Sequence, residues 1–217
     1  MYVYNYTEKR TPIMRKTKEE ALVTREQVLR AALYVFSTQG YAASTLEGIA
    51  QEAGVTRGAV YWHFEGKTEL YHTLVQEQFT RVGERLIGVF SEGGTVRDVL
   101  HRFIVRSLAL VEDDEMYQQV VELTLFKADP GTERAGDIQK KQQGTQALLY
   151  QLEQVLQAGV ETGKVRAGQD LQNTARSLVA LVNGAILLWF QSERAFSLKS
   201  FARTLADTAL NGVLVPA

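Results

Sequence analysis

The scarcity of proline constrains the fold of this chain more than any other feature. Only Pro12, Pro130 and Pro216 interrupt 217 residues, and proline is the residue that breaks the interior of a helix. Apolar residues recur three or four positions apart, the spacing of one helix face, and do not alternate as they do along a half-buried strand. We therefore predict an all-α fold.

Glycines and capping residues divide this pattern into nine expected helices. In the first, apolar residues between positions 28 and 36 share one face, Thr24 is expected to cap the start, and Gly40 marks the end. A capping box from Ser44 to Glu47 is expected to open the second helix, and Gly54 to stop it. The acidic residues 112–115 are expected to start the sixth helix. The first five expected helices are residues 24–39, 44–53, 56–64, 67–90 and 95–111. The sixth runs from the acidic residues to about residue 126, residues 129–131 break it, and the seventh follows and ends at residue 161. The last two are residues 170–190 and 198–214.

Composition excludes several classes of protein. A hydrophobic content of 45% supplies a core, and the absence of cysteine excludes disulfides and thiolate metal sites. The longest apolar run, residues 185–190, is far shorter than the ~20 residues that cross a bilayer. His72 and His101 have no metal-ligand spacing. We expect a cytoplasmic protein with no membrane segment, no metal and no cofactor.

The net charge of −1 is distributed unevenly along the chain. Residues 1–67 carry nine Lys and Arg against seven Asp and Glu, whereas the remainder carries fifteen against eighteen. A basic N-terminal part favours a nucleic-acid contact there, but an asymmetry of this size is also normal for a solvated surface.

Two short predicted helices separated by a glycine-containing turn, residues 53–55, form a helix-turn-helix pattern. In the second of them, Val60 and Phe64 lie four residues apart and are expected to anchor inward. Residues 57, 59, 61 and 63 then point outward. Arg57 has the planar fork that donates two hydrogen bonds to guanine, Ala59 can touch a thymine methyl, and Gly58 lets the backbone approach the duplex.

These segments resemble a known family. Residues 45–50, residues 54–64 and Lys67 closely resemble the DNA-binding domain of the TetR family of repressors, and residues 14–21 are similar to the opening of the AcrR-like regulators of multidrug efflux pumps. The resemblance continues more weakly through residues 122–127, 183–189 and 196–198. The predicted DNA-contacting residues are Thr45, Thr56, Arg57, Gly58, Ala59, Tyr61, Trp62, His63 and Lys67.

The resemblance implies a domain organisation and a mode of action. Residues 1–23 would be an N-terminal extension with a basic arm, residues 24–66 the helix-turn-helix domain, and residues 67–217 a larger helical ligand-binding and dimerisation domain. The last two helices would form a homodimer that binds double-stranded, near-palindromic operator DNA. A small hydrophobic or aromatic inducer would release the operator, and the regulated operon would encode an efflux transporter.

Family pocket positions matched onto this sequence give the expected ligand-lining residues Phe103, Ser107, Val121, Leu125, Gln146, Leu149, Val182 and Ile186. The alternative for each is plain core packing, because apolar helical stripes normally pack against one another.

Two other classes of function compete with a repressor. An enzyme would need a nucleophile elbow, a phosphate-binding glycine loop or paired carboxylates, and none is found in the sequence. A protein-binding helical module would leave the outward residues of the 56–64 segment without a use. The basic residues Arg15, Lys16 and Lys18 fit either a DNA-contacting arm or a solubilising tail.

Overall fold

The computed structural model describes residues 18–127 and 135–215, except for the side chains of residues 135–141. The described part is helical, as predicted, and its only β feature is an isolated bridge between Val165 and Leu214. The helices are α1 Lys18–Gln39, α2 Leu46–Glu52, α3 Arg57–His63, α4 Lys67–Gly88, α5 Val96–Asp113, α6 Glu115–Phe126, α7 Ala135–Glu161, α8 Leu171–Gln191 and α9 Leu198–Val213, with a 3₁₀ turn, η1 Val89–Ser91, after α4.

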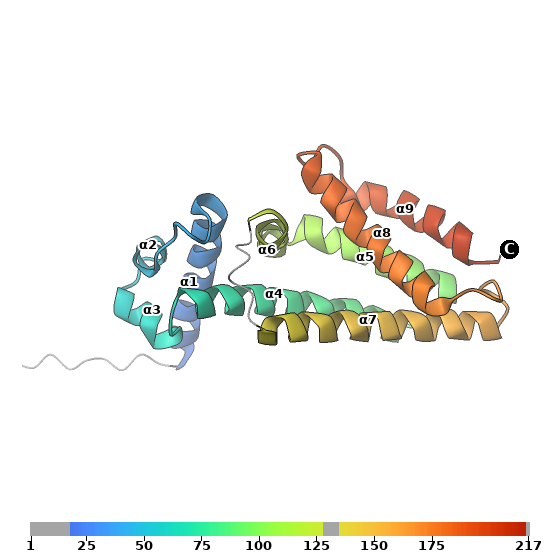
Figure 1. The fold of residues 1–217 in the computed structure, drawn as a ribbon, viewed down its shortest axis with the longest axis horizontal. Coiled ribbons are helices and arrows are strands. Elements are labelled where there is room, and N and C mark those ends of the chain that lie inside the picture. Colours follow the sequence, from blue (N-terminus) through green and yellow to red (C-terminus); the bar gives the residue numbers. More distant parts are fainter. Residues whose placement is uncertain (1–17, 128–134, 216–217) are drawn as a thin grey trace, which may run out of the picture.

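The first three helices form a head at one end of the molecule (Figure 1). Helix α4 leaves this head and runs beside α7, while α5, α8 and α9 stack above them. Helix α6 lies between the head and the stacked helices.

Among the residues that the structure describes, buried side chains form two hydrophobic clusters, and α6 contributes to both. The first joins the head to the beginning of α4, and it also includes Val120 and Leu123 of α6. The second fills the body, and it includes Tyr117 and Val121 of α6. Successive residues of one helix are thus buried in different cores, so α6 cannot move without disturbing both. The first core extends beyond residue 66, and a domain boundary at that position stays a prediction.

The expected starts of the first two helices are wrong in detail. Helix α1 begins at Lys18, and Thr24 lies inside it, where its hydroxyl donates to the Glu20 carbonyl at 2.8 Å instead of capping. A threonine inside a helix satisfies its hydroxyl through the preceding turn, so the residue type alone does not mark a cap. Thr45, not Ser44, caps α2 by accepting from the Gly48 amide.

The acidic cluster 112–115 is divided between two helices and does not simply start one. Asp114 caps α6 by accepting from the Tyr117 amide. Glu112 belongs to α5 and accepts from the backbone amide of Lys199 at 2.7 Å. Asp113 pairs with the Lys199 ammonium, which raises the pKa of that lysine. Two of the acids therefore hold the start of α9 against the end of α5.

Helix α8 is long and apolar enough, by length and composition alone, to cross a membrane. Its buried residues, which include Leu178, Val182 and Trp189, belong to the core of the body. The Trp189 indole donates to the Phe196 carbonyl at 2.6 Å, which ties α8 to the segment before α9.

Candidate nucleic-acid interface and ligand-binding region

The turn between α2 and α3 has the geometry that the helix-turn-helix pattern predicts. Gly54 has φ +65°, and its amide donates to the Gln51 carbonyl while the Val55 amide donates to the Ala50 carbonyl at 3.0 Å. This pair of bonds satisfies the last carbonyls of α2 and requires a left-handed residue, for which glycine is best suited. The turn fixes the angle at which α3 leaves α2.

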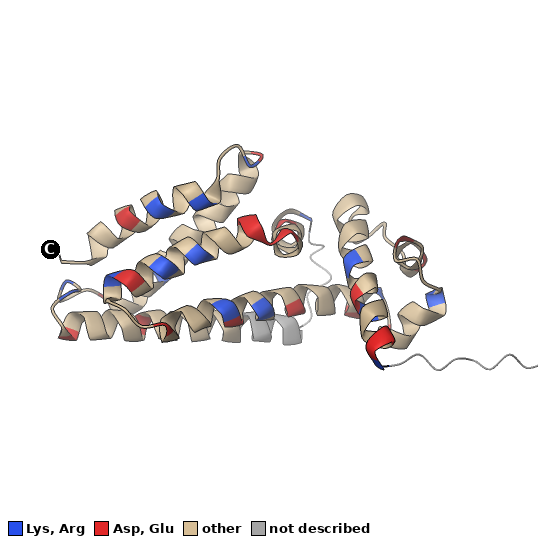
Figure 2. Ribbon diagram, turned by 180° about the vertical axis from the view of Figure 1, so that it is seen from behind, with Lys and Arg blue, Asp and Glu red and all other residues tan. Residues whose placement is uncertain are grey.

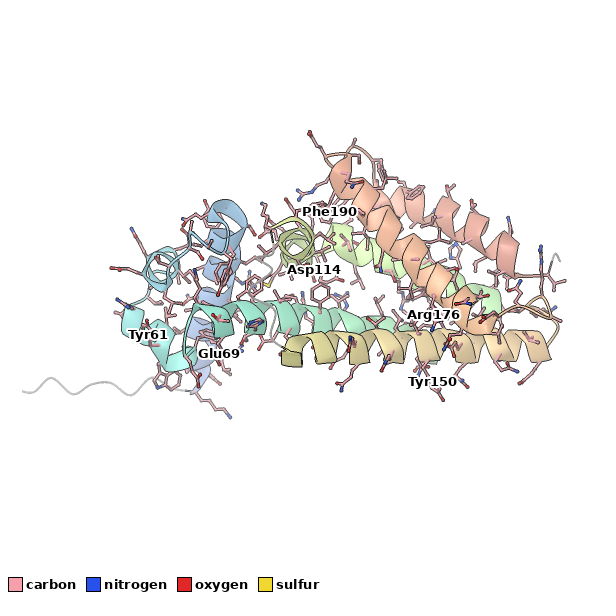
Figure 3. The ribbon with its side chains drawn as sticks, viewed as in Figure 1. Tyr61, Glu69, Asp114, Tyr150, Arg176 and Phe190 are labelled. Carbon is pink, nitrogen blue, oxygen red and sulfur yellow. The ribbon has the colours of Figure 1, made fainter. Side chains whose placement is uncertain are left out.

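Helix α3 is anchored by the two residues that the sequence singled out. Val60 is fully buried and Phe64 is 2% exposed, and Thr56 caps the helix by accepting from the Ala59 amide at 3.2 Å. The opposite side of α3 faces outward: Trp62 is 72% exposed and Tyr61 is 46% exposed. Tyr61 lies at the outer end of the head (Figure 3).

Arg57 is held in place by its neighbour one turn later. Its Nη2 donates to the Tyr61 hydroxyl at 3.2 Å, and its guanidinium carbon lies 5.4 Å from the centre of the Tyr61 ring. This hydrogen bond raises the pKa of Arg57 above its usual value. A guanidinium has five N–H donors, so most of the fork remains available to an acceptor outside the protein.

The other residues of the head that are predicted to contact DNA have different surroundings. Thr45 and Thr56 use their oxygens as cap acceptors and keep a hydroxyl hydrogen to donate. The rings of Trp62 and His63 meet edge-to-face with centroids 4.5 Å apart. Ala59 is half-buried.

Gly58 is exposed, and nothing inside the protein requires glycine at this position. A Cβ built there would lie 3.9 Å from Thr56 Oγ1, an ordinary van der Waals contact. Glycine in a helix also costs about 1 kcal/mol relative to alanine. A requirement for glycine at position 58 would therefore have to come from a partner outside the fold.

Lys67, another predicted DNA contact, is bonded to backbone carbonyls within the head. Its ammonium donates to the carbonyls of Tyr41 at 2.7 Å, Ala42 at 3.3 Å and Ser44 at 2.9 Å, and it lies 4.4 Å from the centre of the Tyr41 ring. These three bonds match the three N–H donors of lysine. The geometry favours a role in holding the loop before α2 against the start of α4.

The eight predicted ligand-lining residues do not share one environment. Phe103, Val121, Val182 and Ile186 are buried in the core of the body, and Leu149 packs against it. Ser107 is buried and donates its hydroxyl to the Phe103 carbonyl at 2.7 Å. Gln146 is exposed, and Leu125 is 49% exposed. Six of the eight thus lie in or against the interior of the body, and two point to solvent.

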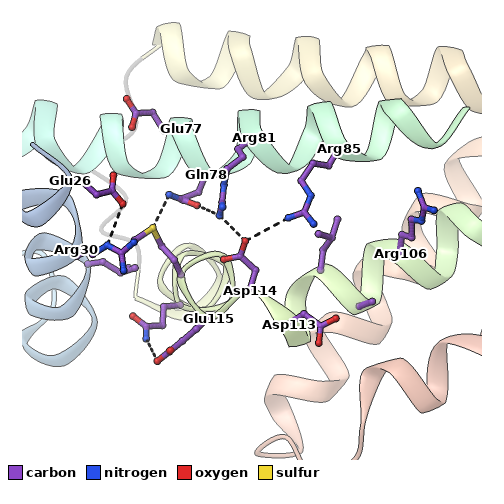
Figure 4. A pocket seen from close by; sticks show the side chains of 15 residues that line it. Glu26, Arg30, Glu77, Gln78, Arg81, Arg85, Arg106, Asp113, Asp114 and Glu115 are labelled. Carbon is purple, nitrogen blue, oxygen red and sulfur yellow. Dashed lines mark hydrogen bonds and ion pairs between the residues drawn. The ribbon is translucent and has the colours of Figure 1, made fainter. Parts of the chain in front are cut away.

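A polar cleft of about 940 Å³ lies where the head meets the body (Figure 4). None of the eight predicted residues lines it. Arg81 of α4 pairs with Asp114 at 2.8 Å, and Arg85 approaches the same carboxylate at 3.9 Å. Gln78 connects Arg81 to Met116 of α6. Acidic and basic residues are interspersed along α4 and α5 (Figure 2), and the Arg81–Asp114 pair bridges α4 and the start of α6 at the cleft. The sequence had indicated only that the acidic residues 112–115 start a helix, not that a cleft forms beside them.

Helix α8 carries an exposed apolar stripe. The sequence had predicted a strongly apolar helix here, but it did not show which of its apolar residues are exposed and which are buried. Leu181, Leu187 and Leu188 are between 37% and 52% exposed, and Gly184 lies between them on the same side of the helix. Large apolar side chains gathered on one helix face commonly mark a protein interface.

Comparison with known proteins places the chain among bacterial regulators. Residues 28–74 match the family model for bacterial regulatory proteins of the tetR family, and residues 96–215 match the model for the C-terminal part of BetI-type transcriptional repressors. The transcriptional repressor BepR of Brucella suis biovar 1 (strain 1330) is 30% identical and covers 94% of this chain and 98% of its own length. The regulator AcrR of Shigella flexneri is 30% identical, with 87% of this chain and 88% of AcrR covered.

Solved structures agree with this assignment. NalD, the secondary repressor of the MexAB-OprM multidrug efflux pump in Pseudomonas aeruginosa, aligns with a TM-score of 0.77 at 25% identity, covering 92% of this chain and all of NalD. A complex of SmeT with triclosan aligns with a TM-score of 0.74 at 28% identity, covering 90% of this chain and 93% of SmeT.

Proposed function

Because this chain belongs to the TetR family of bacterial transcriptional regulators, we propose that it is a repressor that binds a near-palindromic operator as a homodimer and is released by a small hydrophobic or aromatic ligand. The chain is a regulator and not an enzyme. Regulators similar to it control multidrug efflux pumps, which supports an efflux transporter operon as the target and the cytoplasm as the location.

The observation that carries the proposal is the exposed face of α3. Arg57 is the first residue of α3 and is exposed, whereas Val60 and Phe64 are buried, and its guanidinium already donates to the Tyr61 hydroxyl without DNA. A preorganised side chain loses less conformational freedom on binding. Arg57 is accordingly assigned to guanine O6 and N7, and the hydroxyls of Thr45 and Thr56 to the phosphates.

The exposed stripe on α8 supports the dimer. A homodimer that places its symmetry axis at α8 and α9 buries Leu181 and Leu188, and it carries one α3 on each side of that axis. Two-fold symmetry in the protein then requires two-fold symmetry in the operator.

The interior of the body is the proposed ligand site. Phe103 stacks on Phe90 with ring centroids 5.9 Å apart, and Val182 and Ile186 are buried in the same hydrophobic core. Such a lining takes apolar and aromatic molecules. We leave Leu125 and Gln146 out of the proposed site because both are exposed. Triclosan, which the similar SmeT binds, is a suitable probe. It should weaken operator binding by the wild type. Val121→Trp, which fills the core of the body with a larger side chain, should abolish this effect of triclosan.

The test of DNA reading selects bound sequences from a random duplex library. The wild type should enrich a near-palindrome, whereas Arg57→Ala should lose preference at one base pair in each half-site, worth about 1–3 kcal/mol of discrimination. Gly58→Ala should be as stable as the wild type or more so, yet bind the operator more weakly. Lys164→Met, an exposed change in the body, is the control.

Two outcomes would refute the proposal. One is a wild type that enriches no sequence. The other is an Arg57→Ala variant that loses affinity equally for the operator and for random DNA, because a side chain that reads a base must change selectivity.

A further inference from the structure

The turn between α8 and α9 contains two consecutive non-glycine residues in the left-handed region. Glu193 has φ +54° and Arg194 has φ +62°. L-residues with side chains adopt this conformation only when the surrounding structure holds them there, whereas glycine would adopt it without strain. Contacts elsewhere in the protein must therefore hold these two residues in the left-handed conformation, and Arg194 makes such contacts.

Arg194 attaches the end of α8 to α6. Its guanidinium lies 5.6 Å from the centre of the Trp189 ring and 5.4 Å from that of Phe190, and its Nη2 donates to Glu122 of α6. Phe190, at the end of α8 that lies towards α6 (Figure 3), contacts Phe126 with ring centroids 6.0 Å apart. The second half of α6 is thus joined to the α8–α9 turn by an ion pair and to the end of α8 by an aromatic contact.

Glu122 extends this connection towards the head. Its other carboxylate oxygen lies 3.8 Å from the ammonium of Lys127, and this ammonium donates to the Ser37 carbonyl at 2.7 Å. Ser37 lies in the last turn of α1, where carbonyls have no partner within the helix and a cation is favourable. The contacts from Arg194 through Glu122 and Lys127 to Ser37 therefore run without interruption from the α8–α9 turn to the end of α1.

The packing of α6 supports the same connection. Val120 and Leu123 flank Glu122 and are fully buried in the core of the head. Helix α1, which accepts the last bond of the series, packs directly against α2 and α3. A displacement of α6 that breaks the Arg194 pair would therefore also disturb the helix on which α3 rests.

We propose that Arg194, Glu122 and Lys127 are positioning residues that fix the DNA-binding head relative to α8 and α9. They hold α1 in place without contacting DNA. The consequence for DNA binding rests on the proposed function, because only a repressor that dimerises through α8 and α9 needs its two heads at a set distance. The connection itself is a property of one chain.

The test compares two glycine substitutions in the same turn. Glu193→Gly and Arg194→Gly both relieve a left-handed side chain, but only Arg194→Gly removes the guanidinium. Amide hydrogen exchange is read at Gly40, whose amide donates to the Phe36 carbonyl at the end of α1. Arg194→Gly should speed this exchange about two- to five-fold, the range that one partly exposed ion pair provides, and Glu193→Gly should leave it unchanged.

Operator affinity provides a second readout. Arg194→Gly should weaken binding about two- to five-fold with the oligomeric state unchanged. Lys127→Met should weaken binding by a similar factor. The double variant with both substitutions should bind the operator as well as the weaker single variant, because each substitution interrupts the same series of contacts. Glu122→Gln, which keeps the shape of the side chain, replaces Arg194→Gly if that variant does not fold.

Three results would overturn the inference: faster exchange confined to residues 189–198, equal effects of the two glycine variants at Gly40, or additive losses in the double variant. A wild type that binds no operator would refute the proposed function instead, and the exchange measurement would still decide the connection.

Discussion

Replacing Lys67 with methionine tests whether this residue supports the head or contacts DNA. Methionine keeps an unbranched apolar stem and removes the ammonium that binds the carbonyls of Tyr41, Ala42 and Ser44. Each hydrogen bond to a charged group contributes about 1.5–3 kcal/mol. Because the three bonds share one half-exposed ammonium, we expect a combined loss of about 2–3 kcal/mol in the free energy of unfolding, near the size of one such bond.

Thermal unfolding followed by circular dichroism measures this effect. For a chain of 217 residues, a loss of that size lowers the Tm by about 4–12 °C. Lys164→Met, in the exposed turn before α8, should leave the Tm unchanged. The salt dependence of operator binding is measured on the same samples.

The opposite result would support the predicted role of Lys67 as a phosphate contact. In that case the Tm of Lys67→Met would match the wild type, all DNA sequences would bind more weakly, and the slope of log K against log salt would flatten by about 0.9.

Three further predictions concern packing, assembly and pH. Gly159→Ala should destabilise the protein by about 1–3 kcal/mol in urea unfolding, because the added Cβ would lie 2.4 Å from a methyl group of Val165. Unchanged stability would show that Val165 moves aside at no cost in free energy. Leu188→Glu should give a folded monomer of 24.3 kDa by light scattering, since it places a charge in the exposed stripe of α8; a helical dimer would exclude α8 from the interface. Burial raises the pKa of Tyr117 to about 12, with a smaller effect from Asp114. Between pH 10 and 12 the unfolded chain therefore loses this proton before the folded one does, and stability should fall by about 2–3 kcal/mol as the pH rises. Tyr117→Phe should remove that part of the decline, and an unchanged pH profile would contradict the assigned pKa.

Local sequence rules predicted the helix-turn-helix well because its determinants lie within one or two turns of each other. Thr56 caps α3, Val60 and Phe64 are buried, and Gly54 has the left-handed conformation expected of it. Each of these properties depends on neighbours in sequence, so spacing alone identifies it. Thr24 shows the limit of such rules, because a threonine at a cap and one inside a helix look the same in sequence.

Properties set by distant segments could not be predicted in this way. The partners of Lys67 lie 23 to 26 residues earlier in the chain. The exposure of Leu125 depends on how α6 is rotated between two cores. Helical periodicity identifies an apolar face, but it does not say whether that face meets a core, a ligand or a second subunit.

Guanine methylation interference on the selected operator tests the central claim most directly. If Arg57 donates to guanine N7, a methyl group at that atom should block wild-type binding at one guanine in each half-site, and the two guanines should be related by the operator's symmetry. Arg57→Ala should bind the methylated and unmethylated operators equally. Wild-type binding that tolerates methylation at every guanine, or an Arg57→Ala variant as sensitive as the wild type, would contradict the claim that α3 reads base edges through Arg57.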